Sequence, residues 1–207
     1  MAERGKFIAF EGIDGSGKST QIQLLAARLR ERKSAPYITM EPTDSPIGCL
    51  IQQIMTGRVK TDNRVIAALF AADRLDHILN DVNGLKEKID NGTNVLTDRY
   101  YFSSYAYQCV DMPMEQVIAM NEPSSDILRP DLNIFIDIDE DTAMERILKN
   151  RCQTELFEKK SRLKKTREGY MEAFERLKDR EHILIIDGTL TIEEIAQQVW
   201  NAVEEIL

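Results

Sequence analysis

The sequence contains little cysteine, histidine or tryptophan and no long apolar run. Three Cys and two His are present among 207 residues, and the Cys residues, at positions 49, 109 and 152, are widely spaced. No Cys-x-x-Cys or Cys/His cluster exists, so neither a zinc site nor a disulfide framework is expected. No segment approaches the roughly 18 apolar residues of a membrane span, and the N-terminus lacks a signal-peptide pattern. These absences favour a reduced, cytoplasmic protein without a membrane partner.

The charge of the chain is acidic overall but unevenly distributed. The 27 Lys and Arg residues against 35 Asp and Glu give a net charge of −8, which disfavours a nucleic-acid partner bound by bulk electrostatics. Residues 146–167 nevertheless contain nine Lys or Arg and only two Glu, a local charge of +7. Such a basic segment is either a solvated helix face or a clamp for a small polyanion. The charge pattern alone favours the solvated face.

Short apolar segments alternate with amphipathic segments along the chain. Strands are expected at residues 6–10, 37–40, 94–97, 131–137 and 182–187, and helices at residues 18–33, 47–55, 63–79, 141–150, 157–178 and from 191 onward, where a capping-box motif begins the last helix. This alternation is typical of parallel βαβ units, and near-continuous apolar strands indicate a sheet covered on both faces. With no repeat, low-complexity tract or linker, residues 1–207 are expected to form one α/β domain.

The segment after the first expected strand fits the phosphate-loop (P-loop) pattern G-x-x-x-x-G-K-[ST]. It comprises Gly12, Ile13, Asp14, Gly15, Ser16, Gly17, Lys18 and Ser19, and Thr20 follows in the first helix. Glycines allow successive backbone N–H groups to face a phosphate, and the helix N-terminus adds partial positive charge. Lys18 is expected to reach the β- and γ-phosphates of ATP, and the Ser19 hydroxyl to bind Mg²⁺. A tight turn with a chance Lys-Ser pair is the alternative.

A P-loop alone does not distinguish a kinase from a GTPase, a partitioning or assembly ATPase, or a motor. The sequence has no N-K-x-D guanine-reading motif, which disfavours a GTPase. A small-molecule kinase needs a second phosphate site and a lid. The remaining question is therefore whether other segments supply them.

A second candidate phosphate site lies at the end of the third expected strand. Open α/β sheets bind ligands beyond the carboxyl ends of their strands, and the segment Asp98-Arg99-Tyr100 lies there. Arg99 can clamp a phosphate bidentately, and Asp98 can hold the metal or its water. On a helix, Ser103 and Tyr107 would share a face beside Arg99. The alternative is a helix start with capping serines and core tyrosines.

Phe70 and Arg74 are four residues apart in an expected helix, so an aromatic ring and a guanidinium would lie side by side. This pair suits a planar base, which could stack on Phe70 and accept hydrogen bonds from Arg74. The alternative is a core Phe and a surface Arg paired to Asp73. For this pair alone the second interpretation is favoured.

The stretch D-R-Y-x-x-S-x-x-A-Y-Q at residues 98–108 resembles the corresponding motif of thymidylate kinases. The opening F-E-G-I-D-G-S-G-K-S-T at residues 10–20 is similar to the phosphate loop of that family. The segments E-P-T at 41–43, F-A-A-D-R at 70–74 and R-E-G-Y at 167–170 follow in the family's order. The resemblance covers essentially the whole chain. It implies a P-loop NTPase three-layer fold, with a five-stranded parallel sheet and a helical lid at about residues 146–167.

The resemblance also implies an activity, the ATP-dependent phosphorylation of dTMP to dTDP with Mg²⁺, in a chain that forms homodimers. The implied catalytic residues include Lys18, Asp98 and Arg99, with Ser19 and Asp98 toward the metal. In the family's pattern Phe70 stacks on thymine, Tyr107 disfavours ribose, and Tyr170 approaches the nucleoside from the lid helix. The full set of positions implied to bind substrate is Asp14, Glu41, Phe70, Arg74, Arg99, Ser103, Ser104, Tyr107, Gln108 and Tyr170.

Three positions depart from the family's pattern. Met40 stands where Arg is frequent, Leu156 stands where many bacterial members carry a lid Arg, and Gly15 means that the P-loop carries no Arg of the kind other members use. Another cation must then meet the charge of the transferring phosphoryl group. The basic segment 146–167 is the expected source, which reverses the preference for a solvated face, and Arg151 is the expected catalytic residue.

Two other functions remain open from the sequence. A sister nucleoside monophosphate or deoxynucleoside kinase would read a different base. A nucleotide-dependent switch or assembly ATPase would hydrolyse ATP slowly, without an acceptor. The Phe70 and Arg74 pair together with Tyr107 favours a pyrimidine deoxynucleotide.

Overall fold

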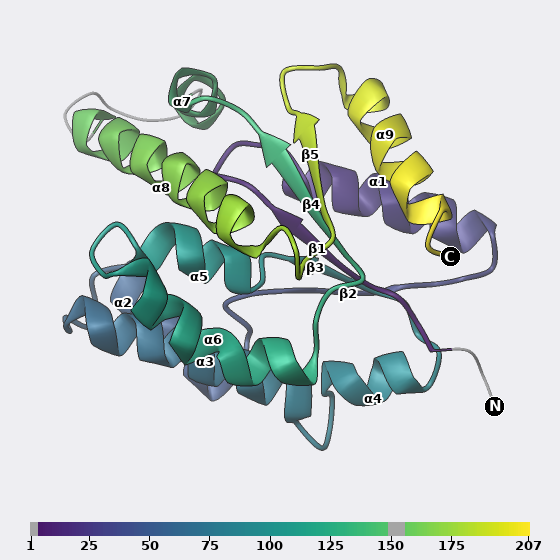
Figure 1. The fold of residues 1–207 in the computed structure, drawn as a ribbon, viewed down its shortest axis with the longest axis horizontal. Helices are drawn as coiled ribbons and strands as arrows, with labels where there is room; N and C mark the ends of the chain where they lie inside the picture. The colour runs from purple at the N-terminus through teal and green to yellow at the C-terminus, as the bar shows by residue number, and fades with distance from the viewer. Residues whose placement is uncertain (1–3, 149–155) are drawn as a thin grey trace.

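Five short strands form one parallel sheet at the centre of the molecule (Figure 1). The computed structural model describes residues 4–148 and 156–207 of the chain. The strands are β1 (Phe7–Glu11), β2 (Tyr37–Met40), β3 (Val95–Asp98), β4 (Leu132–Asp137) and β5 (Ile183–Asp187), in the spatial order β2-β3-β1-β4-β5. Each strand begins and ends within one residue of its expected bounds. The α/β class and the parallel sheet are therefore confirmed.

Helices connect the strands and cover both faces of the sheet. They are α1 (Lys18–Glu31), α2 (Pro46–Met55), α3 (Asn63–Leu79), α4 (Leu85–Asp90), α5 (Tyr101–Gln108), α6 (Met114–Ile127), α7 (Glu140–Leu148), α8 (Leu156–Leu177) and α9 (Ile192–Glu204). The expected capping box is confirmed, because Thr191 Oγ1 accepts from the Glu194 N–H and the Glu194 carboxylate accepts from the Thr191 N–H. The sequence did not predict α4 or α6. Within the described residues, no helix is both long and apolar enough to cross a membrane.

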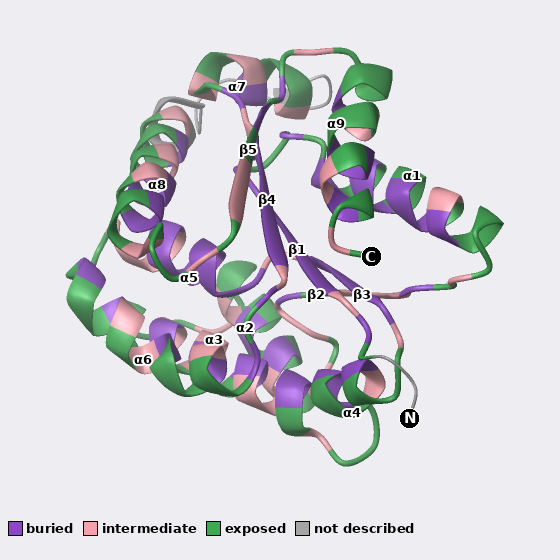
Figure 2. Ribbon diagram, turned by 45° about the vertical axis from the view of Figure 1, so that its right-hand side comes forward, coloured by how far each residue is buried: buried purple, intermediate pink, exposed green. Residues whose placement is uncertain are grey.

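The two faces of the sheet bury separate apolar cores. Successive side chains of a strand point to opposite faces, and along β1 Phe7 and Ala9 join one core while Ile8 and Phe10 join the other. The first core is closed mainly by α3, α5, α6 and α8, and the second by α1 and α9 (Figures 1 and 2). This is why the strands read as continuous apolar runs rather than as alternating ones.

The register of the sheet brings the chemically interesting segments together. Phe10 of β1 pairs with Asp98 of β3, and Glu11 pairs with Phe135 of β4. Because all the strands are parallel, the P-loop after β1 and the Asp98-Arg99 corner after β3 leave the same edge of the sheet. Ligands of such sheets bind at this edge.

Candidate active site

The P-loop follows a backbone path that requires glycine. Gly12, Gly15 and Gly17 have φ angles of 145°, 85° and 101°, which residues with side chains rarely adopt. A Cβ atom on Gly12 would lie 2.8 Å from the carbonyl oxygen of Ile136 on the neighbouring strand. Gly17 is the left-handed N-cap of α1. The loop therefore has the curled backbone that the sequence pattern predicts.

Lys18 curls back over this loop. Its Nζ donates to the carbonyl oxygen of Gly12 at 3.0 Å and to that of Ile13 at 3.4 Å, and the side chain is buried. Burial, together with the nearby charge of Arg99, lowers the pKa of Lys18 to about 8, against the opposing effect of Asp98. A phosphate in the loop would offset this desolvation and favour the charged lysine.

Asp98 and Ser19 lie next to Lys18. The Ser19 hydroxyl donates to Asp98 Oδ2 at 2.9 Å, and Asp98 Oδ1 lies 3.9 Å from Lys18 Nζ. Asp98 Oδ1 is buried and has no hydrogen-bond partner among the described residues. Such an acceptor suits Mg²⁺ or one of its waters. No group of three or more His, Cys, Asp or Glu side chains in the described part of the chain could hold a metal alone. The donor set therefore fits an ion that is bound mainly through nucleotide phosphates.

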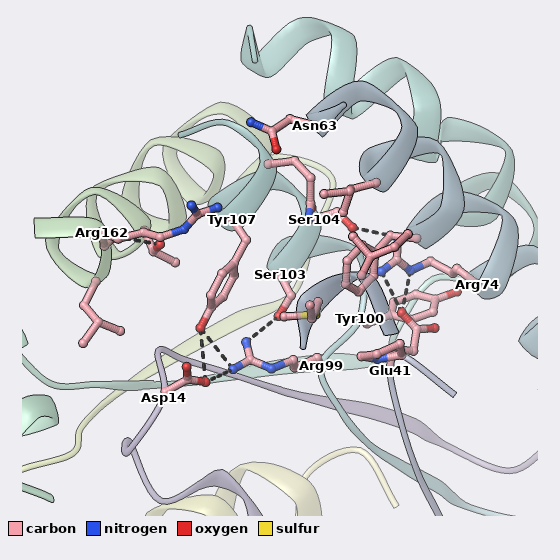
Figure 3. A pocket seen from close by; sticks show the side chains of 18 residues that line it. Asp14, Glu41, Asn63, Arg74, Arg99, Tyr100, Ser103, Ser104, Tyr107 and Arg162 are labelled. Atoms are coloured by element: carbon pink, nitrogen blue, oxygen red, sulfur yellow. Dashed lines mark hydrogen bonds and ion pairs between the residues drawn. The ribbon is translucent and has the colours of Figure 1, made fainter. Parts of the chain in front are cut away.

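Two cavities open at this edge of the sheet. The aromatic cavity, of about 460 Å³, is bordered by Phe70, Tyr100 and Tyr107 among others (Figure 3). The P-loop cavity, of about 450 Å³, is lined by Asp14, Gly15, Gly17, Lys18, Ser19, Thr20, Met40, Glu41, Asp98 and Arg99. Asp14, Glu41 and Arg99 line both cavities. The two cavities therefore meet at these three side chains.

Arg99 occupies the junction with a backbone conformation that is unusual for a residue with a side chain. Its φ is 73°, and its N–H donates to the carbonyl oxygen of Phe10 at 2.9 Å, which ties the corner after β3 to β1. Its Nη2 donates to Asp14 Oδ1 at 2.6 Å and to the Tyr107 hydroxyl at 3.0 Å. Its Nη1 donates to Ser103 Oγ at 3.1 Å (Figure 3). Left-handed non-glycine residues typically persist at functional sites. The expectation that Ser103 and Tyr107 share a face beside Arg99 is confirmed.

A buried carboxylate lies behind Arg99. Glu11 Oε1 accepts from the N–H groups of Tyr100 and Ser103 at 2.8 and 3.3 Å. Glu11 Oε2 accepts from the hydroxyls of Ser103 and Tyr170 at 2.6 and 2.9 Å. Burial raises the pKa of Glu11, opposed by the Ser103 hydrogen bond and by the charge of Arg99. Glu11 therefore connects the end of β1, the first turn of α5 and α8.

Arg74 is buried rather than exposed at the surface. Its Nε and Nη2 donate to Glu41 Oε2 at 2.8 and 2.6 Å, and its Nη1 donates to Ser104 Oγ at 3.1 Å and to Asn121 Oδ1. His77 holds the other Glu41 oxygen at 3.1 Å. The side chain nevertheless borders the aromatic cavity (Figure 3). Four of its five N–H donors have protein partners, so Arg74 is a rigid group with little freedom to turn away from a ligand.

The alternative interpretation of Arg74, as a surface residue paired to Asp73, is wrong. Asp73 instead accepts from the N–H and hydroxyl of Thr43 at 2.8 and 2.6 Å and from the Ser45 hydroxyl at 2.9 Å. It therefore fixes the segment between β2 and α2. Phe70, one turn before Arg74, is half-buried and borders the aromatic cavity.

The remaining predicted substrate residues divide into two groups. Ser104 and Gln108 border the aromatic cavity, and Gln108 Oε1 is buried with no hydrogen-bond partner within the part of the chain that the structure describes. Tyr170 of α8 is fully buried and does not border that cavity. Its hydroxyl lies 2.7 Å from Ser103 Oγ and 3.5 Å from Arg99 Nη1. The structure thus places Tyr170 beneath Arg99 rather than on the cavity wall.

Three arginines of the basic segment 146–167 are described by the structure. Arg146 Nη1 donates to the P-loop carbonyl oxygens of Gly15 and Ser16 at 3.3 and 3.5 Å. Arg167 makes a bidentate pair with Asp137 at 2.6 and 2.8 Å. Arg162 borders the aromatic cavity. Arg151, the predicted catalytic arginine, lies outside the described residues.

No role was assigned from the sequence to three buried residues that lie behind the cavity walls, Glu11, His77 and Asn121. Glu11 places a charge at the end of an otherwise apolar strand, a signal that pattern reading could have used. Asn121 and His77 gave no such signal, because both reach Glu41 or Arg74 only through tertiary contacts. Residue spacing within one helix does not reveal contacts of this kind.

Comparisons with known proteins agree with this geometry. The family model described as "Thymidylate kinase" matches residues 10–199. The chain is 36% identical to a "Probable thymidylate kinase" of Methanocaldococcus jannaschii, over 97% of this chain and 96% of that protein. It is 38% identical to a "Probable thymidylate kinase" of Caldivirga maquilingensis, over 96% of this chain and 93% of that protein. It is 35% identical to a "Thymidylate kinase" of Symbiobacterium thermophilum, over 97% of this chain and 94% of that protein. With a P-loop and a second cavity that meet at Arg99, the chain belongs to the thymidylate kinase family.

Proposed function

We propose that the protein transfers the γ-phosphoryl group of ATP to the phosphate of dTMP, giving dTDP and ADP. The observation that carries this proposal is the junction of two cavities at Asp14, Glu41 and Arg99. One cavity has the P-loop as its wall, and the other is bordered by aromatic and hydrogen-bonding side chains. Two substrates bound in this way would have their phosphates adjacent. Family membership and the names of the relatives support the same reaction.

On the donor side, the P-loop N–H groups and Lys18 would hold the β- and γ-phosphates of ATP. Ser19 and Asp98 would hold Mg²⁺ together with these phosphates. A bound Mg²⁺ neutralises charge on the donor phosphates and orients them. Asp98 Oδ1, which accepts no hydrogen bond from the residues that the structure describes, and the Ser19 hydroxyl beside it support this assignment.

On the acceptor side, Arg99 would hold the phosphate of dTMP. That phosphate is largely ionised at neutral pH, because its second pKa is about 6. The reaction therefore needs positioning and charge stabilisation rather than a strong general base. Phe70 would stack on thymine, with Arg74 and Ser104 at the base edge and Tyr107 near the sugar. The borders of the aromatic cavity support these roles.

Two further parts of the proposal come from the family resemblance. Residues 146–167 would act as a lid that brings Arg151 over the transferring group and excludes water. Two chains would form a homodimer. Leu50 of α2 and Val65 and Leu79 of α3 are exposed apolar side chains that a partner could cover.

The direct test is a coupled assay of ADP release with dTMP, dUMP, dCMP, dAMP and dGMP as acceptors, with and without Mg²⁺. We expect release to depend on Mg²⁺ and to be fastest with dTMP. Equal release without any acceptor would instead support a nucleotide-dependent switch. A preference for another monophosphate would support a sister kinase.

Replacing Phe70 tests base stacking. Phe70→Ala should weaken dTMP binding by roughly 1–3 kcal/mol, the usual magnitude for a lost aromatic platform. ATP affinity should be unchanged, because Phe70 does not line the P-loop cavity. Isothermal titration with each nucleotide measures both effects. Ile192→Ala, which shortens an exposed apolar side chain at the start of α9 and outside the aromatic cavity, is the control and should leave dTMP affinity unchanged. Equal losses for ATP and dTMP would mean that Phe70 serves packing alone.

Replacing the lid arginine tests the assignment of Arg151. Arg151→Ala should lower kcat by roughly 10²–10⁴ while dTMP affinity stays within about tenfold, the pattern of an interaction made mainly in the transition state. Arg162→Ala and Arg167→Ala should each cost less, and steady-state kinetics compares the three. If Arg151→Ala has a normal kcat and one of the two controls loses most of its kcat, the catalytic role belongs to the arginine replaced in that control. Near-normal turnover by all three would leave Arg146, which contacts the P-loop, as the remaining candidate in this segment.

A further inference from the structure

We infer that Glu11 is the positioning residue for Arg99: its carboxylate fixes the hydroxyl protons of Ser103 and Tyr170, so that their lone pairs hold the guanidinium at the junction of the two cavities. This inference rests on the proposed function, in which Arg99 receives the acceptor phosphate. Glu11 is fully buried and lines neither cavity. Any effect it has on substrate must therefore pass through other side chains.

The two oxygens of Glu11 have separate partners. Oε1 accepts from two backbone N–H groups in the first turn of α5, at 2.8 Å from Tyr100 and 3.3 Å from Ser103. The start of α5 has no side-chain cap of its own, so Glu11 supplies one from β1. A negative charge at a helix N-terminus is also electrostatically favourable. Oε1 therefore fixes the position of the helix that carries Ser103.

Oε2 orders the two hydroxyls. It lies 2.6 Å from Ser103 Oγ and 2.9 Å from the Tyr170 hydroxyl, and these hydroxyls are 2.7 Å apart. Either both hydroxyls donate to Oε2, or the Tyr170 hydroxyl donates to Ser103 Oγ and the Ser103 hydroxyl donates to Oε2. In both arrangements the last acceptor is Glu11. Arg99 Nη1 lies 3.1 Å from Ser103 Oγ and 3.5 Å from the Tyr170 hydroxyl. Because a guanidinium only donates, it requires this proton arrangement.

An amide at this position could not reproduce these contacts. Glu11 accepts from four donors, whereas a Gln side chain has one acceptor oxygen and a donating NH₂ group. With the NH₂ group toward Ser103 and Tyr170, their protons would turn toward Arg99. With the amide reversed, the NH₂ group would face the N–H of Tyr100. Either orientation places donor against donor.

The test is Glu11→Gln, measured by steady-state kinetics and by titration with dTMP and with thymidine. We expect the KM for dTMP to rise by about 10- to 100-fold, the usual effect of losing a hydrogen bond to a charged group. The KM for ATP should stay within about threefold, because the hydrogen bond that is lost acts, through Arg99, on the acceptor phosphate and not on ATP. Thymidine, which has no phosphate for Arg99 to hold, should bind as it does to the unaltered protein.

The matched control is Glu181→Gln. Glu181 is also a buried carboxylate that accepts from a tyrosine hydroxyl, that of Tyr101 at 2.8 Å, but it precedes β5 at the opposite edge of the sheet. Its replacement should not change the KM for dTMP. If Glu11→Gln behaves like this control, Glu11 serves stability alone and the inference is wrong.

A double variant keeps the inference testable if Glu11→Gln lowers stability. Adding Tyr170→Phe to Glu11→Gln removes one misdirected hydroxyl, so the KM for dTMP should be no higher than in Glu11→Gln alone. Independent losses that add would contradict the shared-network interpretation. If Glu11→Gln does not fold, Ser103→Ala must still weaken the binding of dTMP more than the binding of thymidine. If the unaltered protein does not phosphorylate dTMP, the proposed function is wrong. Titration of Glu11→Gln with dTMP still measures the effect of Glu11 on dTMP binding.

Discussion

The proposed reaction requires that two polyanions be held with their phosphates adjacent. Two unit charges about 4 Å apart repel by roughly 4 kcal/mol at an effective dielectric constant of about 20. A cation fixed between them is therefore the central requirement, and Arg99 lies where the two cavities meet. Its position is set by the left-handed corner after β3 and by contacts from Asp14, Ser103 and Tyr107.

The parallel sheet explains why these groups come together. The P-loop leaves β1 and Arg99 leaves β3 at one edge, and Glu11 links that edge to α5 and α8. Arg74, which we propose contacts the base, is also fixed in place without a ligand, because Glu41, Ser104 and Asn121 accept its hydrogen bonds. Holding charged groups in place beforehand reduces the ordering that must occur during phosphoryl transfer.

Local patterns predicted the sheet, the P-loop and the position of Arg99, because each depends on neighbouring residues. These patterns did not predict α6, because Pro123 lies inside this helix and proline normally disfavours helix formation at an interior position. They also missed the buried state of Arg74, because its partners Glu41 and Asn121 come from segments distant in the sequence. Tyr170 was expected at the nucleoside from resemblance, and only the packing of α8 against α5 shows it beneath Arg99.

The most direct test of Arg99 as the shared phosphate contact compares dTMP with thymidine. Isothermal titration of the unaltered protein gives the affinity advantage that the 5′-phosphate confers, and Arg99→Gln removes the charge that we hold responsible. We expect this advantage to fall by about 10- to 100-fold, as for loss of hydrogen bonds to a charged group, with thymidine affinity unchanged. Equal losses for dTMP and thymidine would show that Arg99 only maintains the shape of the cavity, and would contradict the account.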